Sequence, residues 1–264
     1  MTSGIDPEEN AAVLEGAIAR AAGEGAEMVF TPEMSGLLDR DRKRAAHSIV
    51  PEQDTVPLAR AREAAHRAGI WVSLGSLAVE TQDGRWANRA FVIDPGGDIA
   101  ARYDKIHMFD VDLASGESWR ESNAYRAGEK VVTVPDTPVG RLGLSICYDI
   151  RFPALFQALG QAQCDCIAIP AAFTAPTGKA HWHVLQRARA IEASAFVVAA
   201  AQVGEHADGR RTYGHSLVID PWGEVSLDMG GEEPELGFAD IDLARIAEVR
   251  AQVPSLANRR EIAK

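Results

Sequence analysis

Three residues with chemically active side chains lie at the ends of predicted strands. Glu33 and Lys105 each follow a strand-like segment, and Cys147 closes the apolar segment that begins at Leu142. Open α/β sheets place their ligand sites at such strand ends. A cysteine at a strand-to-helix turn presents its sulfur where the next backbone N–H groups also point, which favours a thiolate and supplies oxyanion donors. A thiol nucleophile needs a carboxylate for activation and a cation for charge stabilisation, so these residues predict nucleophilic catalysis.

The other cysteines and the histidines have simpler interpretations. Cys164 and Cys166 share a face of a predicted strand. No second Cys or His pair lies nearby to complete a metal site, so we expect them to pack in the core. His181 and His183 begin a predicted helix, where positions two apart do not share a face, and no third ligand is evident. We therefore predict no metal site, and we expect His215 to position a loop or an interface.

The elements that position these side chains alternate between helix-like and strand-like patterns, which indicates an α/β fold. Helices are predicted over 7–22, 56–68 and 181–194, with a weak helix after 243, and strands over 26–30, 70–80, 87–95, 98–102, 142–149, 166–170, 195–203 and 216–220. The stretch 106–130 shows no clear period. Loops of that length are usually functional or disordered, and its three aromatic residues favour an ordered one. No low-complexity linker divides the chain, so we predict a single domain over residues 1–264.

One sequence pattern occurs twice. FVIDPGGDI at 91–99 and LVIDPWGEV at 217–225 share the form apolar-Val-Ile-Asp-Pro-x-Gly-acid-apolar. Each predicts a strand, a tight turn and a returning strand. Two interpretations are open: two unrelated hairpins, or two similar α/β halves that face each other as a pair of sheets covered by helices.

Composition and charge exclude several classes of protein. The 264 residues include 27 basic and 38 acidic side chains, a net charge of −11, and this balance argues against nucleic-acid binding and against a polybasic membrane surface. No apolar stretch is long enough to span a bilayer, and the first residues do not resemble a signal peptide. Three cysteines are too few for a disulfide framework, and no glycine-rich phosphate loop is present. We expect a cytoplasmic protein whose partners are small molecules or copies of itself. The mixed-sign run 39–44 is expected to be a solvated face.

Longer segments around the three reactive residues carry a family resemblance. TPEMSG at 31–36, RYDKIHMFD at 102–110 and LSICYDIRFP at 144–153 resemble the signature segments of the nitrilase superfamily of carbon–nitrogen hydrolases. The similarity covers nearly the whole chain, in the right order. It implies a four-layer α-β-β-α sandwich of the nitrilase type that commonly dimerises through its helices. It implies neither a metal nor an organic cofactor.

The resemblance also assigns roles. It implies that Glu33 is the general base, Cys147 the nucleophile and Lys105 the oxyanion stabiliser. The superfamily's second glutamate matches Glu121, which would orient the substrate and hold the lysine and the base, with Glu117 as a nearby alternative. We expect burial to raise the pKa of the basic carboxylate, with the lysine opposing that rise.

Two further residues are expected to contact the substrate. The backbone N–H of Tyr148 would complete the oxyanion site. Arg151 would meet a substrate carboxylate, and an ion pair with a structural acid is an equal alternative for it.

Segments 180–204 and 213–225 are most similar to the branch of the superfamily that cleaves the amide of a 2-oxoglutaramyl group. Deaminated glutathione is then the favoured substrate, and 2-oxoglutaramate, the substrate of an ω-amidase, is the alternative. An alternative of another class is a non-catalytic dimeric scaffold, which would not need all four polar positions to be filled.

The start of the chain departs from the pattern of the superfamily. Members begin with an apolar strand that runs into a segment like QMTSG, whereas this sequence begins with MTSG at 1–4. We therefore expect the domain to lack the first strand of the fold.

Overall fold

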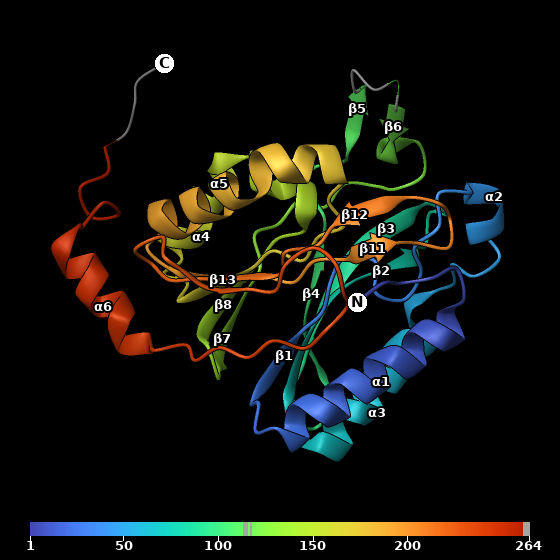
Figure 1. Cartoon of the computed structure of the whole chain (residues 1–264), viewed down its shortest axis with the longest axis horizontal. Coiled ribbons are helices and arrows are strands. Elements are labelled where there is room, and N and C mark those ends of the chain that lie inside the picture. The colour runs from blue at the N-terminus through green and yellow to red at the C-terminus, as the bar shows by residue number, and fades with distance from the viewer. Residues whose placement is uncertain (113–115, 117, 261–264) are drawn as a thin grey trace.

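Two β-sheets lie face to face at the centre of the protein, and helices cover the outer face of each (Figure 1). The computed structural model describes residues 1–112, 116 and 118–260. The layers run helix, sheet, sheet, helix, so the predicted four-layer α-β-β-α sandwich is confirmed.

The first sheet has the strand order β1-β2-β3-β4. Its strands are β1 (Met28–Phe30), β2 (Trp71–Glu80), β3 (Trp86–Ile93) and β4 (Ile99–Asp104), and its covering helices are α1 (Pro7–Gly23) and α3 (Val56–Ala68). β1 and β2 are parallel, and the other pairs are antiparallel. Asp6 caps α1 through its side chain, and Gly69 ends α3 in a left-handed conformation with φ 66°. Both helices were predictable because these start and stop signals are local.

The second sheet has the order β14-β13-β10-β9-β8-β7. Its strands are β7 (Thr133–Thr137), β8 (Gly140–Leu144), β9 (Cys166–Ala168), β10 (Phe196–Ala199), β13 (Leu217–Ile219) and β14 (Val225–Asp228), and its helices are α4 (Pro153–Gln161) and α5 (Ala175–Ala193). The prediction that α5 begins at His181 is wrong, since it begins six residues earlier, at Ala175. Pro176 occupies its first turn, where the missing N–H leaves no hydrogen bond unmade. α4 was not predicted.

The remaining elements are short and lie mainly in connections. They are α2 (Arg42–Ala45), η1 (Glu52–Asp54), β5 (Asp110–Asp112), β6 (Ser118–Arg120), η2 (Glu121–Asn123), η3 (Cys147–Arg151), β11 (Val203–Glu205), β12 (Arg211–Tyr213) and α6 (Leu243–Gln252). Within the stretch 106–130, the described residues form the β5–β6 pair and the η2 turn, so this part of the connection is ordered, as its aromatic residues indicated. Glu117 lies outside the described residues.

The repeated sequence pattern forms the same turn in both sheets. Asp94 N–H donates to the carbonyl of Asp98 at 2.9 Å, and Asp220 N–H donates to the carbonyl of Glu224 at 2.9 Å. In each turn the aspartate Oδ1 also accepts the N–H groups two and four positions later. The hairpins β3–β4 and β13–β14 each end a sheet. The interpretation as two similar halves therefore fits the structure.

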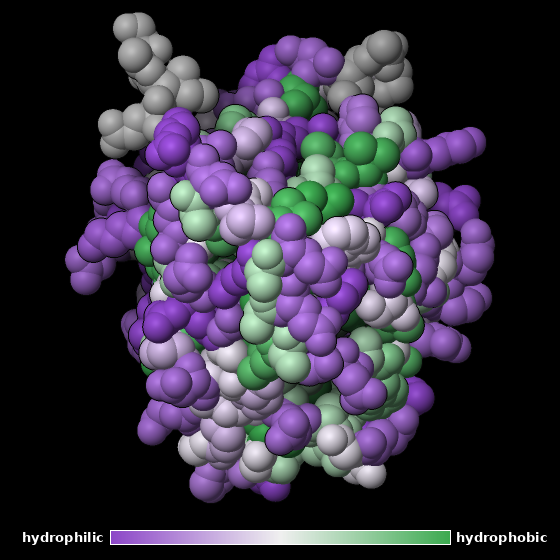
Figure 2. Space-filling model, turned by 90° about the vertical axis from the view of Figure 1, so that its left-hand side faces the viewer, coloured by the Kyte–Doolittle hydropathy of each residue, from purple (hydrophilic) through white to green (hydrophobic). Residues whose placement is uncertain are grey.

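The apolar core is divided by the first sheet. The larger cluster packs the second sheet against the first sheet on one face and against α4 and α5 on the other; it takes Val92 and Tyr103 from the first sheet, Leu142 from the second, and Phe156 and Ala190 from the helices. The other packs α1 and α3 against the outer face of the first sheet. No helix within the described part of the chain is long and apolar enough to cross a membrane. Figure 2 shows a face on which hydrophilic side chains surround several smaller apolar areas.

Candidate active site

The structure brings together the three residues that the sequence placed at strand ends. Glu33 follows β1, Lys105 directly follows β4, and Cys147 opens the η3 turn after β8. The ammonium group of Lys105 lies 2.9 Å from Glu33 Oε1. Since β1 and β4 belong to the first sheet and β8 to the second, the cluster lies where the two sheets meet.

Lys105 bridges two glutamates. Its Nζ donates to Glu33 Oε1 at 2.9 Å and to Glu121 Oε2 at 2.9 Å and Oε1 at 3.2 Å. The side chain of Lys105 is 2 % exposed, that of Glu33 6 % and that of Glu121 12 %. Burying such charges is tolerable only when each one is paired, as here. The structure therefore places Glu121 in the cluster.

Asn88 belongs to the same cluster and was not predicted. Its Nδ2 donates to Glu33 Oε1 at 2.9 Å and to Glu121 Oε1 at 3.2 Å, so it links the two acids as the lysine does. Its backbone carbonyl also accepts the N–H of Lys105 at 2.9 Å. Asn88 is 1 % exposed in β3. An asparagine inside an apolar strand is unusual, and that was the available signal.

The carboxylate of Glu33 is fixed at both oxygens. While the lysine and Asn88 hold Oε1, the N–H of Ala172 donates to Oε2 at 2.9 Å. Desolvation by burial raises the pKa of Glu33, but the charge of Lys105 and the hydrogen bonds from Cys147, Lys105 and Asn88 outweigh it and hold this pKa below its ordinary value. The expected net rise is therefore wrong, because the stabilising contacts exceed the cost of burial.

Cys147 has an unusual backbone conformation for a residue with a side chain. Its φ is +46°, and its N–H donates to the carbonyl of Pro170 at 2.8 Å. A sharp, strained turn between a strand and a helix exposes a nucleophile at the end of a sheet. Burial and the negative charge of Glu33 raise the pKa of the thiol well above its ordinary value, and Lys105 opposes them only in part. The protein therefore holds a thiol beside a carboxylate, rather than the thiolate that the turn alone favoured.

The η3 turn carries the two other predicted substrate contacts. The N–H of Tyr148 donates to no acceptor among the described residues. Arg151 lies over the rings of Tyr148 and Phe173, at 5.8 and 5.3 Å, and its Nη1 donates to His181 Nδ1 at 3.2 Å. Within the ranges that the structure describes it forms no ion pair with an acid. The alternative prediction for Arg151, an ion pair with a structural acid, is therefore not supported.

A cavity of about 1140 Å³ is lined by the predicted site residues Glu33, Lys105, Glu121, Cys147, Tyr148 and Arg151. Its cationic residues are Arg40, Arg42, Lys43, Lys105, Arg120, Arg151, Arg210 and Arg211, and its acidic residues are Glu33, Asp39, Asp41 and Glu121. Residues 40–44 are exposed, as predicted, but the side chain of Asp39 is only 1 % exposed and pairs with Arg44, so the prediction of a solvated face is wrong at Asp39; part of the run also borders this cavity. An excess of cations in a chain of net charge −11 favours an anionic ligand.

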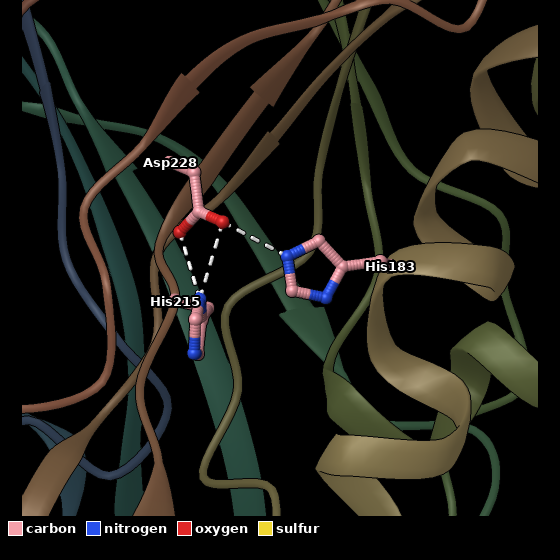
Figure 3. Close-up of side chains that lie close together, drawn as sticks. All are labelled: His183, His215 and Asp228. Carbon is pink, nitrogen blue, oxygen red and sulfur yellow. Dashed lines mark hydrogen bonds and ion pairs between the residues drawn. The ribbon is translucent and has the colours of Figure 1, made fainter.

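The histidines form a second polar cluster, away from the lining of that cavity (Figure 3). His183 Nε2 donates to Asp228 Oδ2 at 2.9 Å, and His215 Nδ1 donates to Asp228 Oδ1 at 2.9 Å. The three groups lie within 4.8 Å of one another, close enough to hold a metal ion. His181 points elsewhere, so the i,i+2 argument against that pair was sound, but the third group was missed because Asp228 lies 45 residues along the chain.

Cys164 and Cys166 are packing residues in this structure. Both are fully buried in the apolar core. Burial raises the pKa of the Cys164 thiol to about 12. Neither belongs to the cavity lining, which agrees with the simpler interpretation of this pair.

Comparisons with known proteins identify the family of this chain. A family model described as carbon-nitrogen hydrolase matches residues 1–251. The chain is 40 % identical to deaminated glutathione amidase of Yersinia enterocolitica over 98 % of this chain and 91 % of that protein. It is 39 % identical to deaminated glutathione amidase of Synechocystis over 98 % of this chain and 95 % of that protein. The crystal structure of the C. elegans NitFhit protein superposes with a TM-score of 0.90 at 38 % identity, over 98 % of this chain and 63 % of that chain.

Proposed function

The chain belongs to the carbon–nitrogen hydrolase family, and from that premise we propose that it is a thiol amidase that converts deaminated glutathione to 2-oxoglutarate and cysteinylglycine. The observation that carries the reaction type is the Glu33–Lys105–Glu121 cluster beside Cys147 in a cavity with excess positive charge. The substrate follows from the similarity to deaminated glutathione amidases and from the anionic ligand that this cavity favours.

The first half of the reaction forms a thioester. As the Cys147 sulfur attacks the amide carbon, its proton passes to Glu33. The oxyanion receives hydrogen bonds from Lys105 and from the N–H of Tyr148, and one such donor is worth about 3–4 kcal/mol of barrier. Glu33 then gives the proton to the leaving nitrogen, the C–N bond breaks, and cysteinylglycine departs.

The second half releases the acid. Water attacks the thioester carbon and gives a proton to Glu33, and the Cys147 sulfur leaves and recovers that proton. Glu121 keeps the ammonium of Lys105 aimed at the reacting oxygen through its own contacts at 2.9 and 3.2 Å. Because the thiol pKa is raised and the Glu33 pKa is lowered, proton transfer becomes favourable only as the attack develops.

The test is to incubate the purified protein with deaminated glutathione and with 2-oxoglutaramate and to quantify 2-oxoglutarate, with Cys147→Ala as the control. We expect preference for the peptide substrate and no product from the variant. Preference for 2-oxoglutaramate would instead make the protein an ω-amidase with the same chemistry. Absence of product from both would contradict the proposal and return the dimeric scaffold as the explanation.

We further propose that this protein works as a cytoplasmic homodimer. Val184 and Ile191 on α5 are 69 % and 49 % exposed, and Trp222 of the β13–β14 turn is 44 % exposed. The turn adjoins the helix, because a Cβ on Gly223 would lie 2.7 Å from the Ile191 side chain. Light scattering on the wild type and on Val184→Glu measures the assembly. A monomeric wild type would contradict the dimer.

A further inference from the structure

One cation of the cavity, Arg210, is held in place but not neutralised by bidentate pairing. Its Nε donates to Asp208 Oδ2 at 2.7 Å, and its side chain is 20 % exposed. By contrast, both oxygens of Asp112 lie within 2.9 Å of the Arg120 guanidinium. Arg211 is 66 % exposed and reaches an acid only at 4.0 Å. Among these arginines, Arg210 combines a fixed position with free donors.

The turn between β11 and β12 fixes Arg210. Asp208 is 7 % exposed as a residue and accepts the backbone N–H groups of Arg210 and Arg40 in addition to the guanidinium. The ring of Trp119 lies under the guanidinium, 5.1 Å from its carbon. The Nη groups of Arg210 have no acceptor among the described residues. They therefore remain available to a planar anion that can accept two hydrogen bonds.

Trp119 supplies an independent sign of a missing acceptor. Its indole Nε1–H is buried and has no hydrogen-bond partner in the part of the chain that the structure describes, and the residue lines the cavity. A buried donor without an acceptor costs free energy that a ligand oxygen would recover. Two unused donor groups therefore lie beside the same stretch of cavity wall.

The location of Arg210 relates it to the catalytic cluster. Burial raises the pKa of the Tyr125 phenol, and Lys105 and Arg210 both oppose that rise. Arg210, Lys105 and Tyr125 line the same cavity, and Arg210 comes from the β11–β12 turn whereas Lys105 follows β4. Arg151, four residues after Cys147 and over the ring of Tyr148, lines the same cavity from the η3 turn that carries the nucleophile.

We propose that Arg210, held by Asp208 and supported by Trp119, binds a carboxylate on the leaving-amine half of the substrate and so selects peptide amides over small primary amides. This rests on the proposed function, in which that group is the terminal carboxylate of cysteinylglycine. Two residues of extended chain span about 7 Å, a length that fits within a cavity of about 1140 Å³. 2-Oxoglutaramate has no such carboxylate, because its leaving group is ammonia.

Two substrates that share the acyl half separate specificity from chemistry. We expect Arg210→Leu to lower kcat/KM for deaminated glutathione about 10- to 100-fold, mainly through KM. The value for 2-oxoglutaramate should change less than about twofold, since the chemical step is untouched. Arg210→Lys should restore part of the loss. Arg60→Leu, which removes a surface arginine that does not line the cavity, should change the kinetics of neither substrate.

A substrate analogue tests the contact itself. Deaminated glutathione whose terminal carboxylate is an amide should be a poor substrate of the wild type and should lose nothing more in Arg210→Leu. Equal losses for deaminated glutathione and 2-oxoglutaramate would overturn the proposal, since Arg210 would then act through the fold. The proposal would also be overturned if Arg210→Leu lowered kcat/KM for the amide analogue as much as it lowers kcat/KM for deaminated glutathione.

Binding without turnover keeps the inference separate from the proposed function. Calorimetry of deaminated glutathione and its amide analogue on Cys147→Ala, with and without Arg210→Leu, reports the carboxylate contact directly. We expect weaker binding when either the arginine or the carboxylate is removed, and no added loss when both are. If the wild type hydrolyses neither substrate, the proposed function fails, and this binding pattern still decides the role of Arg210. If neither Arg210→Leu nor the loss of the terminal carboxylate weakens binding, the proposed contact is overturned.

Discussion

Two carboxylate clusters of this protein combine similar groups at different depths. In the first, Lys105 joins two glutamates with side chains 2–12 % exposed. In the second, Asp228 joins two histidines with side chains 26–34 % exposed. Charges attract far more strongly away from water, and removing one partner there leaves the others uncompensated. The two clusters therefore differ in burial: the buried one can hold reactive charges in place, and the more exposed one only links α5 to the β13–β14 hairpin.

Backbone strain does not make the same distinction. Cys147 in the first region has φ +46°, and His215 in the second has φ +54°. Both residues occupy the left-handed region that a side chain rarely adopts. At Cys147 the strained turn faces the cavity and its carboxylate, whereas at His215 it directs a ring at a surface acid. Strain becomes informative about function only together with its surroundings.

The largest expected effect is that of removing the buried cation. Lys105→Met would leave two buried carboxylates facing each other, and we expect it to cost about 3–5 kcal/mol of folding free energy. Activity should fall at least 100-fold, because an oxyanion donor is lost as well. Urea denaturation and amidase assays measure both. A loss below 1 kcal/mol would show that the buried cluster is no more coupled than the surface one.

The next largest effect is expected at Asn88, whose side-chain amide contacts the same two glutamates as Lys105. Asn88→Ala removes a donor shared by Glu33 and Glu121, and hydrogen bonds to charged groups contribute about 1.5–3 kcal/mol. We expect kcat to fall about 10-fold or more with KM nearly unchanged, because Asn88 positions the acids and is not proposed to touch substrate. A variant with full kcat but reduced stability would assign Asn88 to folding alone.

The direction of the pKa shifts predicts the pH dependence. Glu33 has its pKa lowered from 4.5 and Cys147 has its pKa raised from 9.0. Between these ordinary values neither group changes its protonation, so kcat/KM should be nearly constant from about pH 5 to pH 9. Activity should fall in acid only once Glu33 is protonated, below pH 4.5. A profile from pH 4 to 10 that rises towards pH 9 would instead indicate a reaction limited by free thiolate.

The directions of the pKa shifts also predict how folding stability depends on pH. Because the pKa of Glu33 is lowered, its contribution is present above pH 4.5 and is lost as pH falls through the folded-state value. Because the pKa of Lys105 is raised, its contribution is complete below pH 10.5 and is lost only as pH rises through its higher folded-state value. Because the pKa of Cys147 is also raised, its contribution is complete only below pH 9.0 and is lost as pH rises further. The buried cluster should therefore be insensitive to pH from 4.5 to 9.0, and thermal melting across that range measures it.

What the sequence could predict depends on how local each signal is. Glu33, Lys105 and Cys147 were predictable because each follows a strand, and α/β folds place their ligand sites at the ends of strands. Asn88 was not, since its importance arises from two acids 55 and 33 residues away. The sign of the Glu33 pKa shift needed the actual contacts, because burial and charge oppose each other there.

The second cluster escaped prediction for a similar reason. His183 was judged by its spacing from His181, a local comparison, whereas its partner Asp228 lies on the distant strand β14. The start of α5 was misplaced because its first turn holds a proline and a glycine that weaken a helical pattern. The paired turns at 94–98 and 220–224 were predictable in full, since their hydrogen bonds lie within five residues.

The smallest expected effect lies in the surface cluster and completes the comparison. Asp228→Asn removes the charge that both histidines contact, and an exposed ion pair contributes about 0–1 kcal/mol. We expect the melting temperature to fall by no more than about 4 °C. Kinetics should be unchanged, because none of the three residues lines the cavity. Salt at about 1 M should shrink the difference from the wild type, since it screens exposed charges, while the Lys105→Met difference should persist. Lost activity in Asp228→Asn would show that the hairpin contact reaches the cavity through α5, whose first turn borders it, and depth alone would then no longer separate the two clusters.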